Sequence, residues 1–137
     1  MTEALPYRDF NSWLKQRFGE RVQKIALDAG LGCPNREQGR PCIYCNQRGS
    51  GSGAHARGLS LTEQIDETIA VMRAKYGAAK FLAYFQSYTN THASLTELER
   101  ILGCIRPYAE IVGLAIGTRP DCIDEEKLDL IEQVAGE

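Results

Sequence analysis

Phe81-Leu-Ala-Tyr-Phe85 and Ile111-Val-Gly-Leu-Ala-Ile116 are two short runs in which apolar residues follow one another without polar alternation. Such runs are typical of strands that are covered on both faces, as in a parallel sheet. A further β-prone run extends from Val22 to Asp28. Because segments with helical patterns separate these runs, the sequence predicts an α/β fold with parallel strands.

Helix-start signals precede the helices that this fold requires. Ser60-Leu-Thr-Glu63 and Ser94-Leu-Thr-Glu97 have the pattern of a capping box, in which a serine hydroxyl and a glutamate carboxylate pair with free backbone N–H groups. Asp124 can cap a later helix. An amphipathic helix is also expected over residues 7–19. After it, the predicted order is strand, loop, helix, strand, helix, strand, helix.

Length and composition exclude several classes of protein. The chain has 137 residues, of which 43% are hydrophobic and 25% charged, as in ordinary globular domains. No apolar run approaches the roughly 18 residues of a membrane span. The N-terminus lacks the basic and then apolar pattern of a signal peptide. We therefore expect a cytoplasmic protein with no membrane partner.

The segment 30–58 carries the most informative feature of the sequence, since it contains Cys33, Cys42 and Cys45. It also holds seven of the thirteen glycines, so we predict a long loop without regular structure. Loops of this length in compact domains are usually either functional or disordered, and the cysteines favour a functional loop. The odd number of cysteines, five in all, argues against a disulfide framework.

Two later segments are expected to lie beside this loop. Gln86-Ser-Tyr-Thr-Asn90 follows the second predicted strand, and Gly117-Thr-Arg-Pro-Asp121 follows the third. In α/β folds the functional site lies at the carboxyl ends of the parallel strands. The sequence therefore predicts one site lined by the cysteine loop and by both of these segments.

Thiolates clustered on one loop can converge on a metal centre, and both zinc and iron–sulfur clusters accept them. A structural zinc site normally has four protein ligands, whereas the loop supplies three cysteines and neither His55 nor His92 has a zinc-finger spacing to them. Electron-transfer clusters also usually take four cysteines. A four-iron cluster held by three cysteines would keep one iron open for chemistry. A zinc-stabilised binding module without redox chemistry is the alternative.

The cysteine loop resembles the cluster loop of radical S-adenosylmethionine enzymes. The resemblance lies in the stretch Cys33-Pro-Asn-Arg-Glu-Gln-Gly-Arg-Pro-Cys42-Ile-Tyr-Cys45. The aromatic Tyr44 before the last cysteine fits that loop. The gaps of eight and then two residues depart from the superfamily's common spacing, which is shorter in its first gap. The longer gap resembles the branch that includes the Elongator catalytic subunit. Two further segments are similar to the corresponding motifs of an uncharacterised bacterial subfamily of that branch. These segments are Tyr88-Thr-Asn-Thr91 and Gly117-Thr-Arg-Pro-Asp121.

The resemblance implies a cofactor set and a reaction. Cys33, Cys42 and Cys45 would hold a 4Fe-4S cluster at the end of the first strand of a partial (β/α) barrel, and its open iron would chelate S-adenosyl-L-methionine. One electron, from a reductant such as a flavodoxin or ferredoxin, would cleave S-adenosylmethionine to methionine and a 5′-deoxyadenosyl radical that abstracts hydrogen from substrate. Tyr44 would lie beside the adenine.

Further cofactor-binding candidates follow the second and third strands. Gln86, Ser87 and Asn90 occupy the place of a glycine-rich amino-group site in many superfamily members. That pattern is absent here, so we expect these polar side chains to supply a contact instead. Thr118 and Arg119 are expected at the same mouth. Arg119 can bind a carboxylate or phosphate, with an ion pair to the acidic last helix as the alternative.

Four residues are left without an assigned chemical role. His55 and His92 have no identifiable partner in the sequence, so we expect both to be structural. Cys104 lies among apolar helix positions, which is typical of a core thiol. Cys122 is expected near the mouth of the site, as a packed thiol, a fourth ligand or a reactive thiol.

The substrate is not identified by the sequence. Resemblance to the Elongator branch suggests transfer RNA by analogy, and a small-molecule or protein substrate is equally open. A basic loop is compatible with transfer RNA; its arginines are Arg36, Arg40, Arg48 and Arg57. Residues 1–21 are expected to form an N-terminal helical extension, and 22–137 a truncated radical S-adenosylmethionine domain. With fewer strand–helix units than the resemblance implies, the chain is expected to be the N-terminal half of a partial (β/α) barrel, in need of a further segment or chain.

Overall fold

The computed structural model describes residues 6–47 and 49–136. Its sheet has three parallel strands in the order β1-β2-β3. The elements along the chain are α1 (Phe10–Phe18), β1 (Val22–Leu27), α2 (Pro34–Glu37), the 3₁₀ turn η1 (His55–Arg57), α3 (Leu61–Tyr76), β2 (Lys80–Phe85), α4 (Leu95–Gly103), β3 (Ile111–Ile116), the 3₁₀ turn η2 (Pro120–Cys122) and α5 (Glu125–Ala135).

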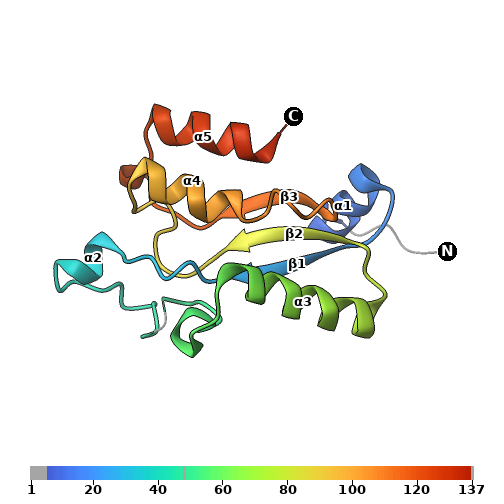
Figure 1. Cartoon of the computed structure of the whole chain (residues 1–137), viewed down its shortest axis with the longest axis horizontal. Helices are drawn as coiled ribbons and strands as arrows, with labels where there is room; N and C mark the ends of the chain where they lie inside the picture. The colour runs from blue at the N-terminus through green and yellow to red at the C-terminus, as the bar shows by residue number, and fades with distance from the viewer. Residues whose placement is uncertain (1–5, 48, 137) are drawn as a thin grey trace.

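The parallel sheet confirms the expected α/β class. The strands β1 and β2 pair in unbroken register from Val22–Lys80 to Leu27–Phe85, whereas β2 and β3 shift register between Phe81 and Leu82. Figure 1 shows the strands running toward the end of the molecule where α2 lies. The sheet is open, and every position of β3 is only half-buried. A barrel formed with further strands stays a prediction.

The helices begin where the capping signals predict. At α3 the Ser60 hydroxyl accepts a hydrogen bond from the Glu63 N–H at 3.2 Å, and the Glu63 carboxylate accepts one from the Ser60 N–H at 2.8 Å. At α4 the structure shows the serine half of the predicted box, from the Glu97 N–H to Ser94 Oγ at 3.3 Å. Asp124 caps α5. Local side-chain chemistry therefore sets these boundaries.

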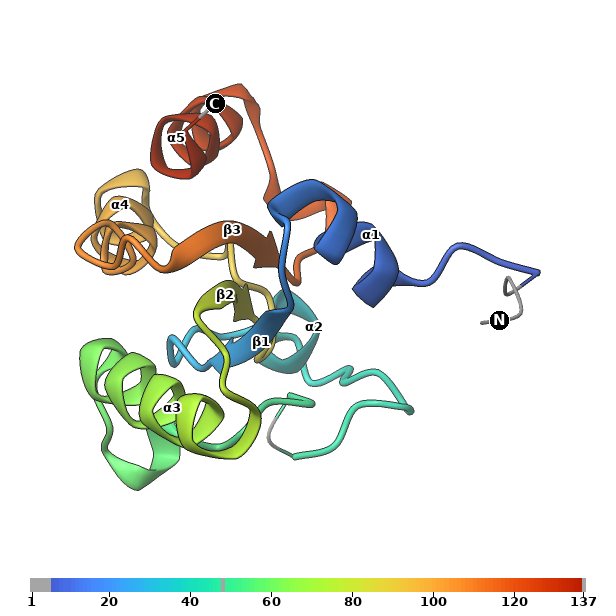
Figure 2. The ribbon, with the colours of Figure 1, turned by 90° about the vertical axis from the view of Figure 1, so that its right-hand side faces the viewer.

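Helices cover the sheet on two sides, as Figure 2 shows with α3 and α4 opposite α1. The main core packs Ile65 of α3 and Ile101 of α4 against strand residues that include Phe81, all of them fully buried. On the other side Leu14 of α1 packs with Leu82 of β2. None of the described helices has the length and apolar character needed to cross a membrane.

The segment between β1 and α3 departs from the expected irregular loop, because it contains the turns α2 and η1. Pro34 stands in the first turn of α2, where its fixed φ favours helix and its missing N–H costs no hydrogen bond. Gly39, with a φ of +70°, follows that turn in the left-handed conformation that glycine adopts readily. The proline was a local signal for this turn.

The two ends of this segment are fixed by one buried side chain. Gln64 of α3 donates to the carbonyls of Asp28 at 2.9 Å and Leu59 at 3.1 Å, and it accepts from the Asp28 N–H at 2.8 Å. Asp28 directly follows β1, and Leu59 directly precedes the α3 capping box. A single amide group therefore joins both ends of the cysteine-bearing segment to the sheet and helix beneath it.

Replacement of Gln64 by leucine is expected to lower the free energy of unfolding by about 2 to 4 kcal/mol, because the buried backbone groups of Asp28 and the half-buried carbonyl of Leu59 lose their partner. Urea denaturation followed by circular dichroism measures this change. Gln133→Leu, at an exposed position of α5, is the matched control and should change stability by less than about 0.5 kcal/mol. Equal effects of both substitutions would contradict the role of Gln64.

Candidate functional site

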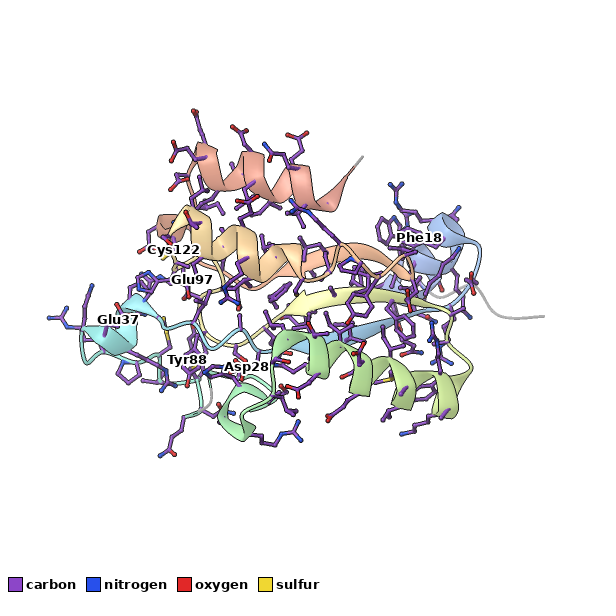
Figure 3. The ribbon with its side chains drawn as sticks, in the orientation of Figure 1. Phe18, Asp28, Glu37, Tyr88, Glu97 and Cys122 are labelled. Carbon is purple, nitrogen blue, oxygen red and sulfur yellow. The ribbon has the colours of Figure 1, made fainter. Side chains whose placement is uncertain are left out.

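A cavity of about 410 Å³ opens at the carboxyl ends of the strands. Its walls come from the cysteine loop, the segment after β2 and the segment after β3, as expected. In Figure 3 the labelled Asp28, Glu37, Tyr88 and Cys122 lie at this end of the sheet, and Phe18 lies at the opposite end. The candidate residues that line the cavity are Cys33, Cys42, Tyr44, Cys45, Gln86, Thr118 and Arg119.

Two other candidates lie outside the cavity lining. Ser87 is 1% exposed and packs so closely under the loop that a Cβ at Gly51 would come within 1.7 Å of Ser87 Oγ. Asn90 is fully buried, and its Nδ2 donates to the carbonyls of Phe85 at 3.1 Å and Gly117 at 3.0 Å. Asn90 therefore joins the carboxyl ends of β2 and β3, and its observed contacts are structural.

The cavity also has lining residues that belong to the predicted segments but were not candidates individually: Asn35, Arg36, Gly49, Ser50, Tyr88 and Thr89. Tyr88, which has a φ of +61°, donates through its N–H to Gly49 O at 3.2 Å and through its hydroxyl to Gln47 O at 2.9 Å. A Cβ at Gly49 would come within 2.5 Å of the Tyr88 ring. The glycine-rich stretch was the available signal, since glycine permits this close approach.

Hydrogen bonds favour the thiolate of Cys33. Burial acts to raise the pKa of this thiol, but polar neighbours lower it below its ordinary value. These neighbours are the Thr89 hydroxyl, the backbone N–H groups of Asn35 and Arg36, and the Arg119 side chain. A thiolate is the form that binds metal and acts as a nucleophile. The surroundings of Cys33 therefore favour a ligand over a packed core thiol.

Cys42 has a similar environment. Its pKa is lowered first by the Tyr44 hydroxyl and then by the Asn35 amide, whose Nδ2 lies 3.3 Å from Cys42 Sγ, while burial and the neighbouring Cys33 act in the opposite direction. The hydrogen bond to Cys42 is also the main cause that raises the pKa of Tyr44. The Tyr44 side chain is 86% exposed, so its ring remains available to a ligand.

Cys45 lies beside the guanidinium of Arg36. Arg36 Nη2 donates to Cys45 Sγ at 3.6 Å and to the carbonyl of Asn46, and the guanidinium lies 5.1 Å from the centre of the Tyr88 ring. Arg36 thus connects the cysteine loop to the segment after β2. Cation–π contact and hydrogen bonding both favour this placement.

Arg119 lines the cavity but already has a carboxylate partner. Its Nε and Nη2 donate to the two carboxylate oxygens of Asp121 at 2.8 and 2.6 Å. This bidentate contact is the main cause that raises the pKa of Arg119. The partner belongs to η2 and not to the acidic helix α5 that the sequence offered as the alternative. An anionic ligand would have to share or displace Asp121.

The sulfurs share a cavity without forming a compact ligand set. Across residues 6–47 and 49–136, no group of three or more His, Cys, Asp or Glu side chains is placed to hold a metal ion. The charge of Cys33 nevertheless acts to raise the pKa of Cys42. The three cysteines therefore line one cavity without being arranged as a set of metal ligands.

The two histidines have different surroundings. His92, for which the sequence identifies no partner, has its Nε2 3.0 Å from both carboxylate oxygens of Glu37. This contact joins α2 to the segment after β2. His55 lies on a neighbouring cavity of about 370 Å³, where its ring packs against Gly30. Neither histidine lines the cavity that Cys33, Cys42 and Cys45 share.

The remaining cysteines are packed away from the cavity. Burial raises the pKa of Cys104 to about 11, and its side chain packs against the main core as expected. Cys122 is buried, and burial followed by the nearby Asp121 raises its pKa. Both environments disfavour the thiolate, in contrast to those of Cys33 and Cys42.

The basic loop is divided between the cavity and the surface. Arg36 lines the cavity, whereas Arg40 and Arg57 are exposed. Arg48 lies outside the described residues. The surface arginines are accessible to an anionic partner.

Comparison with known proteins finds relatives that are longer than this chain. The chain is 35% identical over 131 residues to the uncharacterized protein YtqA of Bacillus subtilis, covering 93% of this chain and 41% of that protein. An uncharacterized protein of Methanocaldococcus jannaschii is 35% identical over 134 residues, covering 96% of this chain and 41% of the relative. Protein YhcC of Escherichia coli is 39% identical over 126 residues, covering 89% and 39%.

The chain thus spans about two-fifths of the length of the curated relatives it matches. No family model matches the chain. No solved structure matches it either.

Removal of the Glu37–His92 contact is expected to loosen α2 with little effect on overall stability. In His92→Ala, the amides of residues 36–40 should exchange with deuterium several-fold faster, while the free energy of unfolding changes by less than about 1 kcal/mol because the pair is partly exposed. Hydrogen exchange with mass spectrometry measures this, with α3 as the internal reference.

Glu37→Gln and the double variant serve as controls. Because both single substitutions remove one contact, the double variant should exchange no faster than His92→Ala alone. Unchanged exchange of α2 in all variants would show that the contact does not hold the turn.

Proposed function

We propose that this chain is the cluster-binding part of a radical S-adenosylmethionine enzyme, with Cys33, Cys42 and Cys45 as the ligands of a 4Fe-4S cluster. The observation that carries the proposal is the shared cavity at the carboxyl ends of the parallel strands, which is lined by all three of these cysteines from one loop. The resemblance of the loop to the cluster loop of that superfamily gives the proposal its chemical identity.

The residues present suit such a group. Among the described residues, the cavity lining includes sulfur donors and no carboxylate or imidazole, a donor set typical of iron–sulfur centres and not of hard cations. The lowered pKa values of Cys33 and Cys42 favour the deprotonated form that a metal centre requires. Three cysteine ligands would leave one iron without a protein ligand.

When bound, the cluster would receive one electron from a reductant such as a flavodoxin or ferredoxin and use it to cleave S-adenosylmethionine. The products would be methionine and a 5′-deoxyadenosyl radical, and the radical would abstract hydrogen from the substrate. The chain's own residues bind and orient. Tyr44, which is 86% exposed, would lie beside the adenine and contact it mostly through its backbone. Gln86 Nε2 donates to Ser50 O at 2.7 Å and holds the glycine-rich stretch beside the cavity. The Thr118 hydroxyl is positioned by its hydrogen bond to Thr91.

The proposal extends to the whole protein. Since the relatives are longer, a segment beyond β3 is proposed to cover the half-buried edge strand and to complete the barrel and the substrate site. The substrate class stays open, and transfer RNA is the class that the resemblance to the Elongator branch favours. The proposed location is cytoplasmic, and no membrane partner is invoked.

Anaerobic reconstitution tests the proposed centre. The purified chain is expected to take up about four irons and a similar amount of sulfide, and replacement of Cys33, Cys42 or Cys45 by alanine should each abolish retention of iron. Iron, sulfide and zinc analysis measures these contents. A companion assay follows reductive cleavage of S-adenosylmethionine by chromatography.

Cys104→Ala is the matched control, since this thiol packs against the core with a raised pKa and should leave the iron content unchanged. Retention of one zinc per chain with no uptake of iron would overturn the proposal in favour of a zinc-stabilised binding module.

A further inference from the structure

The short turn α2 donates hydrogen bonds to two of the three sulfurs in the cavity. Its Asn35 side chain donates to Cys42 Sγ at 3.3 Å, and its Arg36 side chain donates to Cys45 Sγ at 3.6 Å. The backbone N–H of Arg36 donates to the carbonyl of Cys33 at 3.0 Å. One turn of helix, placed between the first two cysteines in sequence, thus supplies a side-chain donor to two of the three sulfurs and a backbone contact to the remaining cysteine.

The turn is itself held in place from outside the loop. Glu37 contacts His92 at 3.0 Å, and Arg36 lies over the ring of Tyr88, so both anchors belong to the segment after β2. The donors in α2 are therefore fixed relative to the sheet. A donor that is held in this way can orient a sulfur as well as bind it.

Arg36 and Arg119 both line the cavity, but they differ in how their charges are balanced. The charge of Arg119 is paired with Asp121 at 2.6 Å. In the described ranges no Asp or Glu lies within salt-bridge distance of Arg36. The positive charge of Arg36 is therefore uncompensated by a carboxylate at its position beside Cys45.

We propose that α2 is a sulfur-orienting turn and that Arg36 is a positioning residue that raises the reduction potential of the centre held by the cysteines. This inference rests on the proposed function. An added electron increases the negative charge on the sulfurs, so a nearby cation and N–H donors stabilise the reduced form more than the oxidised form. Loss of the charge must then make reduction harder.

A redox titration of the anaerobically reconstituted chain tests this inference. Dithionite serves as the reductant, and visible absorbance at set potentials follows the ratio of reduced to oxidised centre. The variants are Arg36→Gln, which removes the charge, and Arg36→Lys, which keeps it. Arg40→Gln is the matched control, because it removes the same charge from an exposed position of the same loop.

Arg36→Gln is expected to hold as much iron as the wild type but to lower the reduced-to-oxidised ratio at a fixed potential about tenfold, equivalent to about 59 mV for a one-electron couple. Arg40→Gln and Arg36→Lys should stay much closer to the wild type. Equal potentials for Arg36→Gln and Arg40→Gln, with wild-type iron in both, would overturn the inference and leave the proposed function standing. Failure of the wild type to take up iron would instead overturn the proposed function.

A second variant covers the case in which Arg36→Gln loses iron. Asn35→Leu removes the amide donor to Cys42 without changing any charge, and it is expected to shift the potential in the same direction by a smaller amount. An unchanged potential in Asn35→Leu would then show that α2 does not tune the centre.

Discussion

The three hydrogen bonds of Gln64 are the constraint on which the candidate site depends. The segment that carries the cysteines leaves the sheet at Asp28 and returns to α3 after Leu59, and the buried Gln64 amide joins both points. Closing a long loop costs conformational entropy, and burying backbone groups without hydrogen-bond partners adds a second free-energy cost. Gln64 reduces the second cost and fixes where the loop begins and ends. The Cys33 side chain then has a defined position relative to the sheet.

The other walls of the cavity are fixed by the same kind of contact. Asn90 joins the carbonyls of Phe85 and Gly117, at the ends of β2 and β3. Thr91 hydrogen-bonds to the hydroxyl of Thr118 and the carbonyl of Cys122, which holds the segment that carries Arg119. Buried polar side chains therefore set the relative positions of the walls, and the residues that face the cavity are left to contact a ligand. This division explains why Asn90 is close to the site without lining it.

Much of the fold could be predicted because its signals are local. The apolar runs, the capping serines and Asp124 lie within the elements that they define, and parallel strands necessarily place their carboxyl ends at one edge. The contacts that the sequence did not predict join distant segments: Arg36 with Tyr88, Glu37 with His92, and Ser87 against Gly51. Nothing in the sequence pattern of one segment specifies which residue of another it meets. The turn α2 was also not predicted, although Pro34 directly after Cys33 was a local signal for it.

The proposed function requires the cavity lined by Cys33, Cys42 and Cys45 to hold an iron–sulfur centre with one iron free to bind S-adenosylmethionine. Electron paramagnetic resonance of the reduced, reconstituted chain with and without S-adenosylmethionine detects such binding. We expect the spectrum to change when S-adenosylmethionine is added, because its amino and carboxylate groups would bind the iron that lacks a cysteine ligand. An iron-loaded chain whose spectrum is the same with and without S-adenosylmethionine would contradict it.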